Sequence, residues 1–264
     1  MNILRRFLIS GGIVLAMLVT GFPLTSNAAV DPTIGRGKKV LYVYNQTKLE
    51  KARASVPPPA DLKRIPALDS WRRNDTKVID FLKSLGFFVT GTDENSPVDV
   101  AKDQDLIIIS ESVDALDIGT KYRNVPVPLI TFENDLLGEL GMTALKNGRD
   151  YGTDDNQRFL WLVNAPHPLA AGLSAGIQNV LNDENLKMNW GKPGLGAITI
   201  ATLRGEPDKA AIFAYEKGAT MNSEFLAPAR RLSFFLWQNT FEQLRPEGLA
   251  LFRAAVLWSV TRPD

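Results

Sequence analysis

The chain has 264 residues, 45% of them hydrophobic, which is enough for a substantial core without disulfide bonds. Its 30 basic and 29 acidic side chains nearly cancel, and this balance argues against a dedicated nucleic-acid binder, which would carry a basic surplus. There is no cysteine, so disulfides, thiolate chemistry and a cysteine-linked lipid anchor are excluded.

The first 29 residues have the pattern of a secretion signal. Arg5 and Arg6 precede an uncharged, mostly apolar stretch over 8–22, and small residues follow at 26–29. We therefore expect a signal peptide over 1–29, an extracytoplasmic protein (periplasmic or secreted), and no stable membrane insertion after cleavage. An uncleaved anchor is the alternative. Residues 30–264 are long enough for one α/β domain, with a formal charge of −1 once the two arginines are removed.

Four apolar runs in the first half predict strands buried on both faces of a parallel sheet: 39–45, 87–92, 105–110 and 127–132. Helical spacing predicts a helix over 74–85, and a second helix is expected over 134–140, ending at Gly141. Strands that alternate with helices in short units indicate a doubly wound α/β fold.

The second half predicts more strands and few helices. The expected strands cover 159–163, 197–203, 211–215 and 231–236, and the last two are expected to pair as an antiparallel hairpin at the sheet edge. A final helix over 240–260 would direct an apolar face into the core.

The segment 48–73 is long for a connection between a strand and a helix. It contains the run VPPPA and seven basic against three acidic residues, which favours a solvated surface insertion. The alternative is a lid over the carboxyl edge of the sheet, where the first such loop of an α/β fold lies. A lid predicts that substitutions at Arg72 or Arg73 change ligand binding without changing stability.

Several runs follow one another in a familiar order: DLIIIS, IGTKYRNVPVPLITFENDLLGELGMT, HPLAAGL, NWGKP, AAIFAYEKGA, APARRLSFFLWQN and ALFRAAVLWSV. Over about 38–260 the chain resembles a family of secreted bacterial domains of uncharacterised function, related to the ThuA-like branch of the class I glutamine amidotransferase-like superfamily. The resemblance implies a flavodoxin-like, three-layer α/β sandwich with a mostly parallel central sheet. Any site would lie beyond the carboxyl ends of the strands.

In the amidotransferases a cysteine on a sharp strand-to-helix turn works with a histidine and a glutamate. The matching turn here is 131–134, which presents Glu133 and no cysteine, so a cysteine-dependent glutaminase is excluded. A late strand that often ends in histidine among ThuA-like proteins ends here in Trp237-Gln238-Asn239, and a carboxamide is no general base.

His167, between Pro166 and Pro168, is the only histidine. We expect it to bond loop carbonyls or the helix start beside it, with a catalytic or metal role as the alternative. One histidine without converging carboxylates is a poor metal site, so no metal and no cofactor are expected.

Polar side chains follow each expected strand, and parallel strands would bring them to one edge. The catalytic candidates are Glu111, Glu133 and Glu216, because carboxylates held close raise one another's pKa and can divide acid and nucleophile roles. The ligand-binding candidates are Asn45, Ser110, Ser112, Asn134, Tyr215, Lys217 and Asn239. The structural alternatives are that Glu133 caps a helix, Glu111 is a solvated loop acid, and Glu216 pairs with Lys217 in a turn.

Two further motifs have a structural and a functional interpretation. Trp190 is expected to be a buried indole in a turn, or an exposed ring that stacks on a sugar. Arg230 and Arg231 are expected to keep an edge strand in solution rather than to grip an anion.

The sequence therefore favours an amidotransferase-like domain without catalytic cysteine, acting outside the cytoplasm as a non-catalytic binding or interaction module for a small molecule or carbohydrate. The first alternative is a carboxylate-dependent hydrolase acting on carbohydrate or cell-wall material. The resemblance to ThuA-like proteins, which are associated with sugar utilisation, favours this alternative by analogy only. The second is a structural component of the envelope.

Overall fold

The structure is a computed structural model that describes residues 33, 35–54 and 65–261, all within one compact unit, Asp31–Asp264. The signal peptide expected over 1–29 lies outside the described residues. Among the residues described, no helix is both long and apolar enough to cross a membrane.

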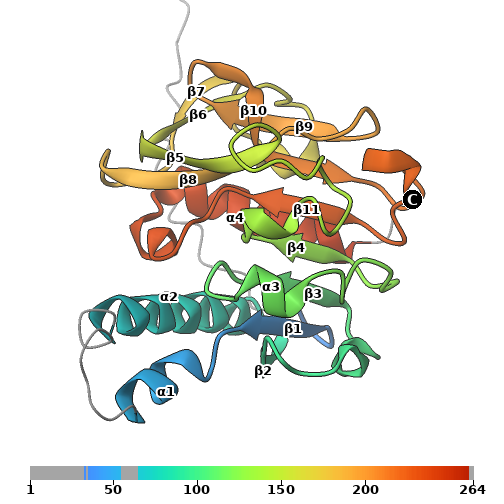
Figure 1. The fold of residues 1–264 in the computed structure, drawn as a ribbon. Coiled ribbons are helices and arrows are strands. Elements are labelled where there is room, and N and C mark those ends of the chain that lie inside the picture. The colour runs from blue at the N-terminus through green and yellow to red at the C-terminus, as the bar shows by residue number, and fades with distance from the viewer. Residues whose placement is uncertain (1–32, 34, 55–64, 262–264) are drawn as a thin grey trace, which may run out of the picture. The chain divides into compact units, whose positions relative to one another are not determined.

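The described strands form one mixed sheet of eleven strands (Figure 1). Five neighbouring strands run parallel, in the order β2 (Phe88–Asp93), β1 (Lys39–Tyr44), β3 (Leu106–Ile109), β4 (Leu129–Thr131) and β11 (Arg231–Phe234). The sheet continues with antiparallel pairs through β10 (Glu206–Tyr215), β9 (Ile198–Leu203), β6 (Phe159–Leu162) and β7 (Gly176–Asn179). On a side branch, β8 (Leu186–Gly191) pairs with β10 and with β5 (Tyr151–Gln157). The prediction of an α/β fold with a mostly parallel sheet and a late antiparallel part is confirmed.

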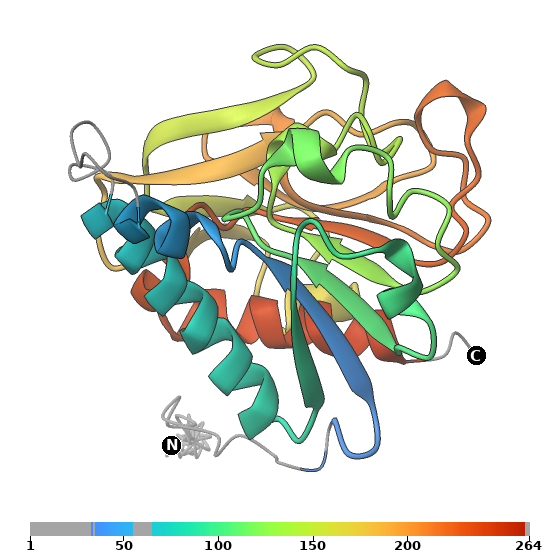
Figure 2. The same ribbon diagram turned by 60° about the horizontal axis from the view of Figure 1, so that its bottom comes forward.

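The parallel strands are buried on both faces, as their uninterrupted apolar sequences predict. In β1, Val40 and Tyr42 join the core under helices α2 (Ile65–Ser84) and α4 (Pro246–Val260), while Leu41 and Val43 join the core of the opposite face. Figure 2 shows both long helices on the same side of the sheet. The opposite face is covered by loops and short helices, among them η2 (Val98–Ala101), α3 (Ala115–Ile118) and η3 (Asn134–Leu136).

The expected late hairpin exists, but it lies inside the sheet rather than at its edge. Strand β10 pairs with β11 on one side and with β9 on the other, and β6 and β7 extend the sheet further. Strands β5, β7 and β8 were not predicted. The sequences of β5 and β7, YGTDDNQ and GIQN, lack the apolar run or strict alternation that marks a strand. The sequence of β8, LKMNWG, does alternate, but its end at NWGKP was interpreted as a turn.

The helix boundaries also differ from the expectation. Of the segment 48–73, residues 55–64 lie outside the described residues, and the rest forms helix α1 (Lys48–Ala54) and the first turns of α2. Helix α2 can include Pro66 because it sits in the first turn, where a missing N–H costs no hydrogen bond. The helix expected over 134–140 is only the single turn η3. The last helix is divided into η6 (Thr240–Gln243) and α4, which starts at Pro246. Two further short turns are η4 (Pro168–Ala170) and η5 (Asn222–Glu224).

Candidate functional site

The carboxyl edge of the parallel strands gathers most of the residues that the sequence proposed for a site. Strands β1, β3 and β4 are parallel neighbours, so the residues that follow them lie at one edge of the sheet. Strand β11 is parallel to β4 and ends at the same edge. The candidates placed there are Asn45, Ser110, Glu111, Ser112, Glu133, Asn134 and Asn239.

A buried carboxylate that the sequence analysis missed organises this edge. Asp75 of α2 is buried and accepts hydrogen bonds from Tyr42 Oη (2.8 Å), Ser110 Oγ (2.5 Å) and Ser112 Oγ (2.8 Å). Burial raises the pKa of Asp75, and the hydrogen bonds from the two serines and the tyrosine oppose that rise. The signal in the sequence was a carboxylate on the apolar stripe of a helix, three residues before Val78.

Asn45 joins the end of β1 to its surroundings. Its Nδ2 donates to the buried carboxylate of Glu94, which also accepts from the backbone N of Asp114. Its Oδ1 accepts from the backbone N of Lys48 at 2.8 Å and so holds the start of α1. Glu94, which follows β2, is a second carboxylate of this edge that the sequence analysis did not name.

Glu111 and Glu133 occupy equivalent positions on adjacent strands. Ile109 of β3 is in register with Thr131 of β4, and each glutamate lies two residues further on. Neighbouring strands are about 5 Å apart, so the two carboxyl groups are close. Burial raises the pKa of Glu133 to about 8. Burial also raises the pKa of Glu111 well above its usual value, and the charge of Glu133 raises it further.

Both carboxyl groups have a structural role. Glu133 Oε1 accepts from the backbone N of Asp135 at 2.8 Å and caps η3, as the structural alternative expected. Glu111 Oε2 accepts from the backbone N of Gln238 at 2.8 Å and fixes the loop after β11. Glu111 is therefore half-buried and bonded rather than a solvated loop acid. The backbone of Glu133 has an ordinary φ of −74°, so this turn has no strained nucleophile geometry.

The expectation that Tyr215, Glu216 and Lys217 join this edge is wrong. They follow β10, which is antiparallel to β11, so they lie at the amino edge of the parallel strands. Tyr215 Oη is buried there and donates to the carbonyl of Met142 at 2.7 Å. Glu216 pairs with Arg230 at 2.7 Å, and Lys217 is exposed.

His167 has the structural role that the sequence favoured. It is the N-cap of η4, and its Nδ1 accepts from the backbone N of Leu169 at 3.2 Å. Its ring centre lies 6.0 Å from that of Trp258, and burial lowers the pKa of His167. Trp258 also packs against the guanidinium of Arg230, which pairs with Glu216, so the ring of His167 lies near the amino edge, away from Glu111 and Glu133.

Three other expectations need correction. Trp190 lies in strand β8 rather than in a turn, and its buried indole donates to Asp154 Oδ1 at 2.8 Å, so no sugar can stack on it. Arg231 begins an interior strand and is fully buried, and Arg230 beside it is buried against Trp258 with a guanidinium-to-ring distance of 4.3 Å. Neither arginine solubilises a sheet edge.

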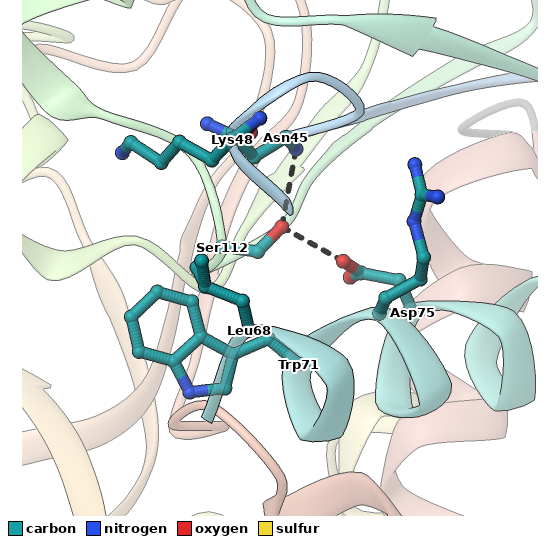
Figure 3. Close-up of a pocket in the computed structure, with 7 residues that line it drawn as sticks. Asn45, Lys48, Leu68, Trp71, Asp75 and Ser112 are labelled. Atoms are coloured by element: carbon teal, nitrogen blue, oxygen red, sulfur yellow. Dashed lines mark hydrogen bonds between the residues drawn. The ribbon is translucent and has the colours of Figure 1, made fainter. Parts of the chain in front are cut away.

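A hollow lies between the carboxyl edge and the two helices of the segment 48–73 (Figure 3). Its volume is about 10 Å³, room for about one water molecule. Strand ends and helices both contribute to its wall, which consists of Asn45, Lys48, Leu68, Trp71, Arg72, Asp75 and Ser112. From the segment 48–73, the described residues Lys48, Leu68, Trp71 and Arg72 contribute to this wall. Trp71 was not predicted, because the proline-rich sequence before it hid the first turns of α2.

The carboxyl groups at this edge are engaged in hydrogen bonds. In the described part of the chain, no three carboxylate or imidazole side chains are arranged to hold a metal ion. The carboxyl groups of Asp75, Glu94, Glu111 and Glu133 all accept hydrogen bonds from the protein itself.

Three solved structures have a backbone trace similar to that of this chain. A putative ThuA-like protein from Bacteroides uniformis is 14% identical, with 91% of this chain and 96% of that chain covered and a TM-score of 0.49. A putative component of GMP synthase from Thermoplasma acidophilum is 13% identical, covering 84% and 94%, with a TM-score of 0.44. The N-terminal domain of mmIFT52 is 10% identical, covering 86% and 99%, with a TM-score of 0.44.

Similarities at this level do not extend any activity of those proteins to this chain. No protein-family model matches the sequence, and no curated protein matches it. The absence of cysteine is decisive on one point: the chain is not a cysteine-dependent glutaminase.

Proposed function

We propose that the chain is a non-catalytic binding module that holds a small polar molecule at the carboxyl edge of its parallel strands, beneath α1 and the first turns of α2. The observation that carries the proposal is the composition of the hollow. Hydrogen-bonding groups of Asn45 and Ser112 meet the indole of Trp71 and the cations Lys48 and Arg72 around it. An aromatic face beside a few convergent polar groups is typical of small-molecule sites.

The catalytic candidates support binding over turnover. Neither Glu111 nor Glu133 lines the hollow, and both use a carboxyl oxygen to hold a backbone N–H. Only the second oxygen of each carboxyl group is left for contact with a substrate.

The hollow has room for about one water molecule, so binding of a larger molecule requires α1 to move. Besides the bond from Lys48 N to Asn45 at its start, the described side-chain contacts of α1 are ion pairs: Arg53 with Asp69 at 2.7 Å, Arg72 with Glu50 at 3.4 Å, and Lys48 with Asp114 at 3.4 Å. Partly exposed pairs of this kind contribute about 0–1 kcal/mol each, which a ligand can replace. The proposal includes export from the cytoplasm, supported only by the sequence of residues 1–29.

The test is a thermal-shift screen of residues 30–264 against sugars and cell-wall fragments, followed by titration of each compound that raises the melting temperature. At ~100 times its Kd, a ligand of this site should raise the melting temperature by several degrees. Arg72→Gln should then weaken binding by about tenfold, since Arg72 lines the hollow. Its neighbour Arg73 is exposed and absent from the wall, so Arg73→Gln is the matched control. Equal binding by the wild type, Arg72→Gln and Arg73→Gln would refute this site.

A hydrolase is the second candidate, and the in-register pair Glu111 and Glu133 is the observation that favours it. A carboxyl group with a pKa of about 8 stays protonated at neutral pH and could serve as a general acid. Hydrolase action predicts that residues 30–264 cleave a carbohydrate or wall fragment and that Glu133→Gln abolishes turnover while the fold survives. Full activity of Glu133→Gln on a substrate that the parent protein cleaves would remove Glu133 from the mechanism.

A further inference from the structure

Two exposed leucines lie on adjoining loops at the amino edge, opposite the hollow. Leu195 is fully exposed, and Leu226 is 57% exposed. The loops are in contact, because a Cβ on Gly196 would lie 2.2 Å from the carbonyl of Thr220, and Thr220 forms a bridge with Leu226. Exposed leucines gathered on one surface are typical of an interaction site.

Near these leucines lies a guanidinium that has no ion-pair or hydrogen-bond partner among the described residues, that of Arg123. Arg123 packs over the ring of Phe225 with its central carbon 4.5 Å from the ring centre. Its Nε is buried without an acceptor, and within the described residues its guanidinium has no ion pair and no hydrogen bond. Gly141 allows this close packing, since a Cβ there would lie 3.3 Å from the ring of Phe225 and 3.5 Å from Arg123 Nη2.

A carboxylate without a partner lies on the same loop. Glu224 precedes Phe225, is exposed, and has no ion pair or hydrogen bond from its side chain in the part of the chain that is described. Ser223 and Glu224 have φ values of 56° and 59°, left-handed conformations that cost non-glycine residues of the order of 1 kcal/mol or more each. The bond from Met221 N to the carbonyl of Phe225 (2.7 Å) closes this turn.

We propose that this surface, formed by Arg123, Leu195, Glu224, Phe225 and Leu226, binds a second copy of the chain across a two-fold axis. Arg123 packs on Phe225, the residue after Glu224, so one patch carries a cation and an anion without ion-pair partners among the described residues, and such a patch is complementary to itself. A two-fold axis sets Arg123 of each copy against Glu224 of the other, with the leucines between them. Arginine and aromatic residues such as Arg123 and Phe225 are also enriched at protein interfaces relative to the rest of the surface.

The small size of the patch makes this a weak, reversible dimer. Interfaces below about 1,200 Å² are typical of transient complexes. The association should therefore appear with rising concentration, over about 1 µM to 1 mM.

The experiment measures the mass of residues 30–264 by sedimentation equilibrium over that concentration range. The wild type should change from monomer to dimer, and Leu226→Ser should raise the dimer Kd at least about tenfold. Arg123→Glu and Glu224→Arg should each be monomeric, because each brings like charges together across the axis. An equimolar mixture of the two should form a heterodimer, in which both contacts are again between opposite charges.

Matched controls separate this surface from others. Leu116→Ser removes another almost fully exposed leucine, which lies on α3, and Glu184→Arg reverses another exposed acid. Both should dimerise as the wild type does, and all variants should keep the melting temperature of the wild-type monomer. A wild type that stays monomeric at about 1 mM overturns the proposal. Normal dimerisation of Arg123→Glu or of Glu224→Arg alone would also overturn the proposal, and so would a mixture of the two that fails to associate.

Discussion

Arg231 carries a positive charge into the interior without a carboxylate to neutralise it. Its guanidinium donates to the carbonyls of Arg123, Val125, Val127 and Arg230, at 2.6–3.3 Å. Burial lowers the pKa of Arg231 to about 10, so the group stays charged at neutral pH. The side chain fixes the loop before β4 against the start of β11.

Replacing Arg231 by methionine should lower the free energy of unfolding by about 3 kcal/mol, because several carbonyls lose their donor at once in a water-poor site. Urea unfolding followed by circular dichroism measures the change. The exposed Arg204 provides the control, and Arg204→Met should alter stability by less than about 0.5 kcal/mol. Equal effects of the two substitutions would show that the buried donors contribute nothing.

Glu133 makes stability depend on pH in the opposite sense to a salt-bridged acid. Its pKa is about 8 in the folded protein against an ordinary value of 4.5, so the folded state holds a proton that the unfolded state releases. The stabilisation is complete below about pH 4.5, falls as the pH rises, and is lost once the pH passes about 8. Glu111 contributes in the same direction, because burial raises its pKa too.

Glu133→Gln should therefore flatten the decline of stability between about pH 5 and 8. Glutamine keeps an oxygen that can accept from Asp135 N, but it has no proton to lose. Unfolding free energies measured at several pH values test this, with the exposed Glu184→Gln as control. An unchanged pH profile in Glu133→Gln would mean that the carboxyl of Glu133 is ionised in the folded protein.

At the residue scale, the sequence predicts which side chains share the carboxyl edge only where it also predicts the strand directions. Glu111 and Glu133 could be predicted to lie together because each follows an apolar run that had to be a parallel strand. Glu216 could not be placed, because an apolar run does not reveal its direction, and β10 runs opposite to β11. Asp75 was missed because its role depends on three hydroxyl groups from β1 and the loop after β3.

Helix α1 is the element held least firmly over the hollow. Its seven residues are joined to α2 and to the loop at Asp114 by three partly exposed ion pairs. An isolated helix of this length is not stable in water, so it depends on its contacts with the rest of the protein.

Salt should therefore loosen α1 selectively. In about 1 M sodium chloride the screening length is about 3 Å, and backbone amides of 51–54 should exchange with deuterium faster than in dilute buffer. Amides of 76–84 in α2 should be unaffected, since that part of the helix packs on the sheet through Val78 and Leu82. Exchange in α1 that is insensitive to salt would show that other contacts hold it.

The elements that could be predicted are those with one clear periodicity. Strand β3 is an apolar run buried on both faces, and the second half of α2 has an apolar stripe, so both were found. The first turns of α2 were not, because proline signals a loop unless it falls in the first turn of a helix, as Pro66 does.

At the scale of the whole molecule, one aromatic side chain joins the two halves of the sequence. The ring of Phe252 in α4 lies 5.8 Å from Phe81 of α2, 5.9 Å from Phe132 after β4, and 5.5 Å from Phe234 of β11. Strand β11 is also the only described strand on the open side of β4. Strand β11 and helix α4, from the second half of the sequence, thus complete the sheet and the helical face that the first half begins. This closure could not be read from local patterns, which do not tell which strands become neighbours.

A fragment of residues 31–148 should consequently fail to fold, although it contains four of the five parallel strands. It would leave β4 as an open edge and expose the apolar face that α4 covers, including Ile130 and Phe132. We expect no cooperative thermal transition by circular dichroism for this fragment, and recovery of the transition when it is refolded with residues 149–264. A fragment 31–148 that unfolds cooperatively by itself would show that the parallel half is an independent domain. The continuous core on the α2 and α4 face would then not be what makes the molecule a single unit.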